Sequence, residues 1–374
     1  MMKTLYFCVR TVRKLPLSVL IQLRNREKLP KLMNSRLIFK LTTAFLIALL
    51  MSLSTVVAPA LAAHGNELDS DIHQSATFAG WLAALKAEAR AKGISDATLD
   101  AALKDVKSDP KIIKFDRNQP EFKLTFNEYL TRVAPPFRVN RGKRLLKKHK
   151  ELLANIQARF GVQPRFIVAL WGMETDFGRL TGGFNVVHAL VTLAYDGRRS
   201  HYFRGELINA LKIIDAGHVT AVAMTGSWAG AMGQTQFMPS TFLKHAIDFN
   251  GDGKTNVWTD SSDALASGAN YLSKTGWKGD ETWGREVKLP ADFPKDMLEL
   301  DVVKPISFWQ AMGVRRIDGK DLPAREISAS IVQLDDKTGA AYMVYDNYRA
   351  IMDWNKSKNF ATAVGILADR IGGY

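Results

Sequence analysis

Residues 164–178 read PRFIVALWGMETDFG. Pro164 is suited to the first position of a helix, because its missing N–H would have no partner there and its fixed φ is helical. The apolar residues that follow recur with helical spacing, so the stretch predicts a helix that begins at Pro164 and ends near Gly178. This predicted helix carries the most informative ionisable side chain of the sequence.

Glu174 lies on the apolar face of that helix. Ile167, Leu170 and Trp171 precede it by seven, four and three positions, a spacing that places side chains on one face. A carboxylate among large apolar residues must be paired, hydrogen-bonded or protonated. Burial raises its pKa, which suits a general acid near neutral pH. Position alone leaves a second interpretation, in which Glu174 only bonds a neighbouring backbone group or arginine.

Most of the remaining chain also has helical periodicity. Between residues 286 and 345, in contrast, prolines separate short alternating stretches at 326–334 and 341–345, which are typical of strands. We therefore predict a mainly α protein of the α+β class, a helical body with a small β-containing subdomain at about 286–345. The helices are expected at 78–107 (with a second helix opened by Ser95), 121–133, 141–160, 202–216, 239–248, 261–274 and 347–371.

Composition narrows the class of protein. The chain has 374 residues, of which 47% are hydrophobic, and this excludes a disordered chain or a small disulfide scaffold. The formal net charge of +14 suggests nucleic acid, but ten Lys/Arg and only one acid lie within residues 1–62. Residues 63–374 keep 41 Lys/Arg and 36 Asp/Glu, so their net charge of +5 argues against a nucleic-acid partner.

Residues 1–62 have the features of an export signal behind an N-terminal extension. Arg36 and Lys40 are followed by an uncharged, mostly apolar run over 41–58. Ala60-Leu61-Ala62 then forms an A-x-A cleavage site. These features predict export to the periplasm.

Processing of this segment would define the mature protein. We expect translation to start at Met33 and cleavage to follow Ala62, which removes Cys8, the only cysteine. The mature chain, 63–374, would then have neither a disulfide nor a cysteine for lipid attachment. The alternative is a retained membrane anchor, because about eighteen apolar residues are just enough to span a bilayer.

A second cluster, at residues 226–239, reads GSWAGAMGQTQFMP. Its small residues would let a ligand approach the backbone closely. Its amide side chains donate and accept hydrogen bonds, as sugar hydroxyl and N-acetyl groups require, and its aromatic rings can stack on sugar rings. The alternative is a tight glycine-rich turn whose aromatic side chains belong to the core.

A third cluster begins at Asp248 and reads DFNGDGKTN. It matches the start of an EF-hand loop, with side-chain oxygens at Asp248, Asn250 and Asp252 and a backbone carbonyl at Lys254. Loop position 12 is Thr259 instead of glutamate, which predicts weak Ca²⁺ binding. The alternative is a metal-free turn rich in Asp and Asn.

The predicted helix at 141–160 begins with a strongly basic run. Such a run is either a solvated face or a contact surface for an anionic polymer. Its cations are Arg141, Lys143, Arg144, Lys147, Lys148 and Lys150.

The three clusters, in this order, resemble the lytic transglycosylase B family of bacterial murein-cleaving enzymes. The stretches that carry the resemblance are 171–178, 193–199, 226–239 and 248–271, and it extends over most of 75–371. It implies a lysozyme-like, mainly α fold with a groove for glycan strands. It also implies that Glu174 is the single catalytic acid/base. This residue would cleave the β-1,4 bond between N-acetylmuramic acid and N-acetylglucosamine without water and leave a 1,6-anhydromuramic acid end.

The resemblance further implies binding residues. No cofactor is required for the chemistry, and Ca²⁺ would be structural. Asp260 competes with Asp263 as the closing ligand, since the loop is about one residue longer than expected. The calcium ligands would be Asp248, Asn250, Asp252, Asp263 and the Lys254 carbonyl. The substrate contacts would be Arg198, Arg199, Ser227, Gln236, Tyr271 and Asn355.

Other functions stay open at this point. A muramidase, which hydrolyses the same bond, would need Asp176, Asp196 or Asp215 as a second carboxylate. A non-catalytic peptidoglycan-binding protein would need none, and the Arg198-Arg199 pair also fits a solvated turn. We expect a monomer that acts on peptidoglycan glycan strands and binds no nucleic acid. The sequence leaves open any partner in a wall-synthesis complex and whether strands are cut internally or from their ends.

Overall fold

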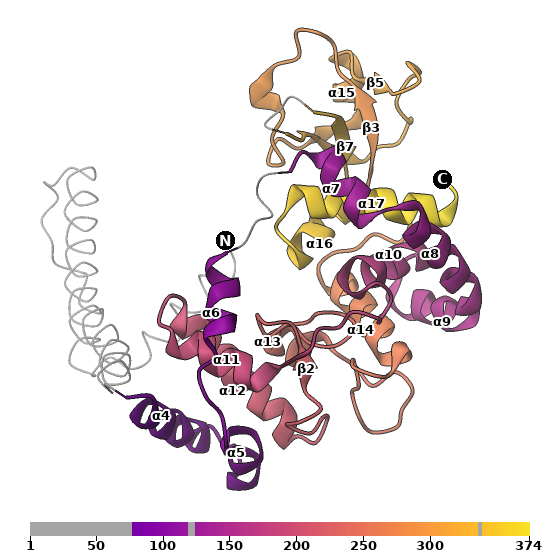
Figure 1. Cartoon of the computed structure of the whole chain (residues 1–374). Helices are drawn as coiled ribbons and strands as arrows, with labels where there is room; N and C mark the ends of the chain where they lie inside the picture. Colours follow the sequence, from indigo (N-terminus) through magenta and orange to yellow (C-terminus); the bar gives the residue numbers. More distant parts are fainter. Residues whose placement is uncertain (1–76, 119–123, 336–338) are drawn as a thin grey trace, which may run out of the picture. The chain divides into compact units, whose positions relative to one another are not determined.

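The computed structural model describes residues 77–118, 124–335 and 339–374 (Figure 1). The predicted extension, signal and cleavage site at 1–62 lie outside these residues. In the described ranges, no helix has the length and apolarity needed to cross a membrane.

Helices dominate the part from Phe78 to Lys274, and their starts follow from local sequence. Ser95 caps its helix by accepting the Thr98 N–H, while Pro110, Pro136 and Pro164 occupy first helical turns. The helices of this part are α4 (Phe78–Ala91), α5 (Asp96–Leu103), α6 (Pro110–Arg117), α7 (Phe126–Val133), α8 (Pro136–Lys148), α9 (Lys150–Phe160), α10 (Pro164–Thr175), α11 (Val186–Tyr195), α12 (Ser200–Asp215), α13 (Pro239–His245) and α14 (Ser261–Lys274).

Several boundaries differ from the sequence prediction, and α6 and α11 were not predicted. The predicted helix 141–160 starts earlier, at Pro136, and is divided at His149, while the predicted helix 347–371 is divided at Asn355 into α16 (Asp346–Trp354) and α17 (Lys358–Gly372). Pro136 starts a helix because proline is favoured at the first helical position.

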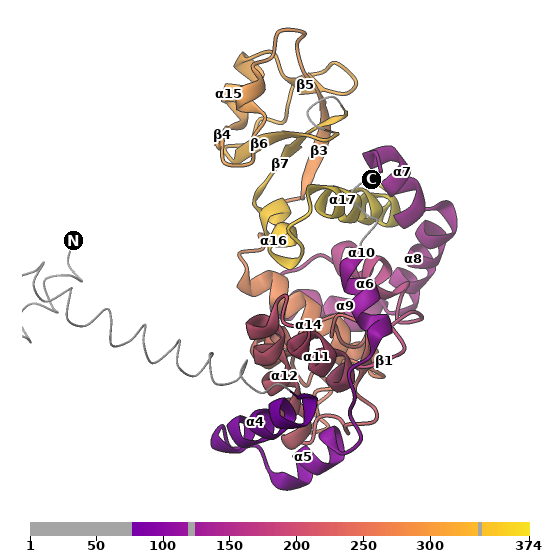
Figure 2. The same cartoon turned by 60° about the vertical axis from the view of Figure 1, so that its left-hand side comes forward.

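The chain from Gly284 to Val344 forms a five-stranded antiparallel sheet in the order β4-β6-β7-β3-β5 (Figure 2). Successive side chains of β7 point to opposite faces of the sheet and pack into two different cores. Tyr342 and Val344 belong to the core of the helical body, whereas Ala341 and Met343 belong to a second core beside α15 (Ile306–Ala311). The predicted helical body with a small β insertion is therefore confirmed. The strands are β3 (Gly284–Lys288), β4 (Lys304–Pro305), β5 (Arg315–Arg316), β6 (Ser328–Gln333) and β7 (Ala341–Val344).

A short antiparallel pairing of two strands far apart in the sequence fixes the start of the glycine-rich segment. β1 (Phe184–Asn185) pairs antiparallel with β2 (Thr225–Gly226). Gly182 approaches this pairing so closely that an added Cβ would lie 2.1 Å from the Gly226 carbonyl oxygen. A side chain is therefore excluded at that position.

Helix α10 is the central element of the helical body. Phe166, Ile167 and Leu170 are buried in its main core, and α10 packs against α8, α9, α14 and α17. A helix surrounded in this way holds its C-terminal residues rigidly, which matters because Glu174 belongs to its last turn.

Candidate active site

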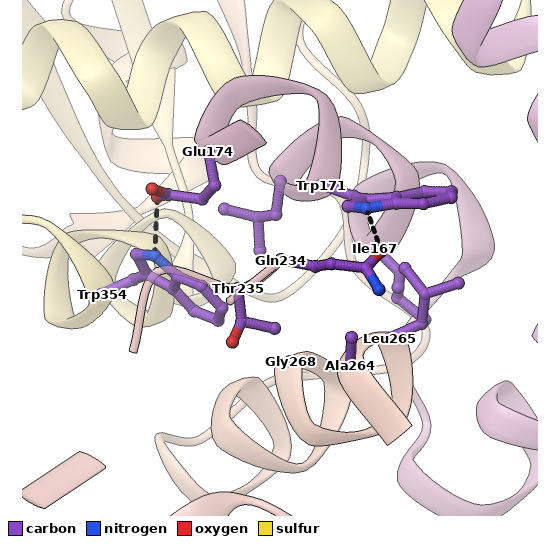
Figure 3. Close-up of a pocket in the computed structure, with 10 residues that line it drawn as sticks. Ile167, Trp171, Glu174, Gln234, Thr235, Ala264, Leu265, Gly268 and Trp354 are labelled. Carbon is purple, nitrogen blue, oxygen red and sulfur yellow. Dashed lines mark hydrogen bonds between the residues drawn. The ribbon is translucent and has the colours of Figure 1, made fainter. Parts of the chain in front are cut away.

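Glu174 projects from the end of α10 into a mostly apolar pocket (Figure 3). The pocket lies between α10, α14, the glycine-rich segment and the end of α16. Within the lining, Glu174 is the only carboxylate. The other lining residues are Ile167, Leu170, Trp171, Gln234, Thr235, Ala264, Leu265, Gly268 and Trp354.

These surroundings change the acidity of Glu174. Burial raises its pKa to about 7, and a hydrogen bond from Trp354 opposes that rise. The indole Nε1 of Trp354 donates to Glu174 Oε1 over 2.8 Å. A carboxyl with this pKa is partly protonated and partly ionised near neutral pH, so it can both give and take a proton.

An unusual turn ends α10 directly after Glu174. Asp176 and Phe177 have φ values of 48° and 63°, a left-handed conformation that costs non-glycine residues energy. At Asp176 this conformational cost is offset by two ion pairs, to Arg138 (3.3 Å) and Arg179 (2.9 Å). Phe177 is buried against Trp171 with ring centroids 5.8 Å apart. Packing thus fixes the turn that orients the last residues of α10.

Gln234 ties α10 to the glycine-rich segment. Its Oε1 accepts from the indole Nε1 of Trp171 (3.0 Å), and its backbone carbonyl accepts from the buried Thr175 hydroxyl (3.0 Å). The same hydroxyl accepts from the Gly178 N–H. Gln234 therefore binds residues on both sides of Glu174, Trp171 and Thr175.

Thr235, which also lines the pocket, has a side-chain oxygen without a partner among the described residues. The residue is 7% exposed, and its hydroxyl Oγ1 is buried with no hydrogen-bond partner among the described residues. A buried hydroxyl without a hydrogen-bond partner costs free energy, which sets Thr235 apart from the other residues that line the pocket. Thr235 was not among the residues predicted from the sequence.

An aromatic cluster packs around Trp354, which lines the pocket. Tyr271 and Phe237 lie 5.0 Å and 5.2 Å from the Trp354 ring, between centroids. The Tyr271 hydroxyl donates to the Asp353 carbonyl (2.7 Å), which fixes the end of α16. Tyr271, a predicted substrate contact, is thus linked to Glu174 through Trp354, by one ring contact and one hydrogen bond.

The carboxylates considered as a second catalytic group are engaged elsewhere. Asp176 is held by two arginines, as described above. Asp196 pairs with Arg117 (2.9 Å). Asp215 accepts hydrogen bonds from Ser95 and Thr98 at the start of α5, which hold its pKa below the usual value.

Arg198 and Arg199 meet on one carboxylate. They bind Asp116 of α6 over 2.6 Å and 2.7 Å, and about half of each arginine side chain stays exposed. Burial raises the pKa of Asp116, but the two guanidinium groups outweigh it and hold the pKa below its usual value. The pair therefore presents two cations and one buried anion, a net positive patch.

Three further predicted contacts have structural roles in their segments. Ser227 Oγ accepts the N–H groups of Ala229 and Ala231 and closes a tight turn. Gln236, at a positive φ of 52°, donates to the carbonyls of Thr181 and Gly233. Asn355 is exposed, and its Oδ1 accepts the N–H of Ser357 just before α17.

The Asp248 loop is a network of carboxylates and backbone N–H groups. Asp248 accepts from the N–H groups of Gly251, Asp252 and Gly253, and Asp252 accepts from that of Lys254. In the described ranges, no group of three or more His, Cys, Asp or Glu side chains converges as a metal site. Any cation here would also need the amide of Asn250 and a backbone carbonyl.

Asp260 and Asp263 differ in their positions beside this loop. Asp260 caps α14 through Oδ1, and its Oδ2 accepts from Asn250 Nδ2 (2.7 Å). Asp263 is fully buried, and its two oxygens accept the N–H groups of Phe249 and Asn256, each over 2.8 Å. Both carboxylates therefore contact the loop.

The chain matches a known protein family over most of the described residues. Residues 77–369 match the family model described as "Transglycosylase SLT domain". The chain belongs to this family. The membrane-bound lytic murein transglycosylase B of Escherichia coli (strain K12) is 33% identical over 251 residues. That match covers 65% of this chain and 66% of the relative, just under two thirds of its length.

Solved structures of this transglycosylase family share the fold. SltB3 from Pseudomonas aeruginosa, in complex with NAG-NAM-pentapeptide, is 43% identical with a TM-score of 0.78, covering 80% of this chain and 81% of that one. Escherichia coli Slt35, in complex with calcium, is 29% identical with a TM-score of 0.67, covering 77% and 91%. The prediction of a lysozyme-like, lytic transglycosylase fold is confirmed.

Proposed function

We propose that this protein cleaves the β-1,4 bond between N-acetylmuramic acid and N-acetylglucosamine of peptidoglycan without water. The observation that carries the proposal is Glu174, the one carboxylate of its pocket, with a pKa of about 7. Membership of the transglycosylase family and the named activity of the Escherichia coli relative support it.

One carboxyl group is enough for this reaction. Protonated Glu174 gives its proton to the glycosidic oxygen as the bond from that oxygen to C1 of the muramic acid breaks. The 2-acetamido group of the same sugar stabilises the positive charge at C1. Ionised Glu174 then takes the proton of the C6 hydroxyl as O6 bonds to C1, which closes the 1,6-anhydro ring and restores the acid. The attack is intramolecular and gains from proximity.

Hydrolysis is less well supported by the site. A second carboxylate would be needed to activate water or to attack C1. Asp176, Asp196 and Asp215 are bound to arginines or hydroxyls, and none lines the Glu174 pocket.

Substrate binding is assigned to the predicted contacts around this pocket. Tyr271 would face a sugar from the aromatic cluster, and Ser227 and Gln236 belong to the segment that borders Glu174. The Arg198–Arg199 patch suits the carboxylates of the wall peptides. Asn355 would act at the exposed end of α16.

We also propose a structural Ca²⁺ in the Asp248 loop. Its donor set, of carboxylate, amide and carbonyl oxygens, is the type that Ca²⁺ prefers. Asp248, Asn250, Asp252 and the Lys254 carbonyl would hold the ion, closed by Asp263 or Asp260. The calcium complex of the related Slt35 supports this assignment. The ion would stiffen the loop ahead of α14 and would take no part in the proton transfers.

The proposed location is the periplasm, after cleavage behind Ala62. The N-terminal sequence of the protein purified from a cell envelope tests this directly. A chain that begins at Ala63 would agree, and one that keeps residues 41–58 would indicate a membrane anchor.

The reaction is tested by the masses of soluble products from purified peptidoglycan. The wild type should release muropeptides one water lighter than those with reducing ends, and Glu174→Gln should release none. Reducing ends would indicate a muramidase. Binding without products from the wild type would indicate a peptidoglycan-binding protein.

A further inference from the structure

A long basic segment surrounds α8. No acid occurs between Glu128 and Glu151, and the catalytic proposal uses none of the cations in this interval. The cations are Arg132, Arg138, Arg141, Lys143, Arg144, Lys147, Lys148 and Lys150.

Two arginines of α8 point inward and stabilise the turn after Glu174. Arg138 binds Asp176 and the Val133 carbonyl, and the Arg141 guanidinium lies 5.8 Å from the centre of the Phe177 ring. The inward-pointing arginines of α8 therefore contact the turn that follows α10.

The outer side of α8 has a different character. Lys143, Arg144, Lys147 and Lys148, here named the basic face, are all exposed. Within the described residues, none of them forms an ion pair, although arginines elsewhere, such as Arg198, are paired. Four unpaired cations within two helical turns repel one another, an arrangement that an anionic partner would stabilise.

We propose that the basic face anchors the protein to the carboxylates of the wall peptides in intact peptidoglycan, outside the Glu174 pocket. This inference rests on the proposed function for the choice of polymer. Peptidoglycan repeats its peptide carboxylates along each strand, so several can meet the basic face at once. Multiple weak contacts then hold the protein near bonds that it can cleave.

An anionic membrane surface fits the observations less well. A helix that lies in a membrane interface needs a free apolar face. The apolar residues Val139, Leu145 and Leu146 of α8 pack against the main core. Phe137, 63% exposed, is the one large apolar side chain of α8 left at the surface.

The test is binding to insoluble peptidoglycan by the protein expressed from its full sequence. All proteins carry Glu174→Gln, so that no cleavage occurs. The test variant has K143Q, R144Q, K147Q and K148Q. The control has K104Q, K107Q, K212Q and K288Q, at four exposed lysines elsewhere on the surface, and therefore the same loss of four positive charges.

We expect the basic-face variant to bind about tenfold more weakly than the control at low salt, because each exposed charge pair contributes modestly. The difference should vanish at about 0.5 M NaCl, where exposed charges are screened. Equal binding by both variants would overturn the inference. So would a loss seen only with vesicles of phosphatidylglycerol and phosphatidylcholine, which would assign the basic face to lipid.

A second measurement separates this inference from the proposed function. With Glu174 restored, the basic-face variant should release products from intact peptidoglycan more slowly but should cleave peptide-free glycan oligomers at the wild-type rate. Equal slowing on both substrates would point to a damaged active site and overturn the anchoring role. If the wild type gives no anhydro products yet still binds through the basic face, the proposed function fails while the anchor stands.

Discussion

The pocket of Glu174 and the loop from Asp248 to Asp263 surround their carboxylate groups in opposite ways. Among the described residues, Glu174 receives one hydrogen bond, from Trp354, and the pocket around it is lined mostly by apolar side chains. Asp248 alone accepts three backbone N–H groups. The first environment disfavours the ionised carboxylate, whereas the second brings several carboxylates together and stabilises their ionised form through backbone N–H groups. Proton transfer is therefore expected where partners are few, and cation binding where oxygens are many.

The largest effect should come from removing the carboxyl group of Glu174. Glu174→Gln keeps the shape but cannot transfer a proton, so we expect kcat on peptidoglycan to fall by about 10³-fold. The matched control is Asp176→Asn, the same chemical change two residues away, in a side chain held by Arg138 and Arg179. Its kcat should fall less than about tenfold, although its stability should fall. Similar losses of kcat would remove the distinction between the two carboxylates.

A smaller effect should appear in stability. The pKa of Glu174 is about 7 in the folded protein and near 4.3 in the unfolded chain, so the folded state binds the extra proton between these values. The wild type therefore loses stability as pH rises through this window. Glu174→Gln should be more stable than the wild type by about 3.5 kcal/mol at pH 8, and by little at pH 4.5.

Urea denaturation at these two pH values measures that difference. Glu151→Gln, at an exposed glutamate, controls for the loss of a carboxylate and should stay within about 0.5 kcal/mol of the wild type. A stability difference for Glu174→Gln that does not depend on pH would show that the pocket does not disfavour the charge.

The sequence anticipated this contrast in part, because its local patterns are informative. The spacing of Ile167, Leu170 and Trp171 placed Glu174 on an apolar face, and the pocket lining agrees. Helix starts such as Ser95 and Pro164 were also predictable, since capping depends on neighbouring residues.

Partners far apart in the chain could not be anticipated in this way. Trp354 lies 180 positions from Glu174, and Asp116 lies 82 positions from Arg198. Only tertiary packing brings such groups together, so no local period signals them. The local sequence around Trp354 gives no sign of its bond to Glu174, and the unpartnered hydroxyl of Thr235 has no sequence signature either.

A third prediction concerns the hydrogen bond that Trp354 donates to Glu174. Trp354→Phe removes the donor that favours the ionised form, so the pKa of Glu174 should rise further, by roughly one unit. The limb of the kcat/KM profile that reports Glu174 should move to higher pH by that amount. Trp277→Phe removes an indole that donates to Gln163 instead, and should leave the limb in place. An unmoved limb in Trp354→Phe would mean that this bond does not tune the acid.

The smallest effect is expected at the other end of the comparison, in the Asp248 loop. With Thr259 in place of the bidentate glutamate, binding should be weak, so about 10 mM CaCl₂ should raise Tm by only about 2 °C. Asp252→Asn should remove this increment while leaving kcat on peptidoglycan unchanged, since the loop lies outside the proton transfers. Comparing Asp260→Asn with Asp263→Asn identifies the closing ligand, because only the true ligand's loss should abolish the calcium-dependent rise. If calcium leaves Tm of the wild type unchanged, the oxygens of this loop serve only the backbone N–H groups that they already accept, and the contrast with Glu174 becomes one of hydrogen bonding alone.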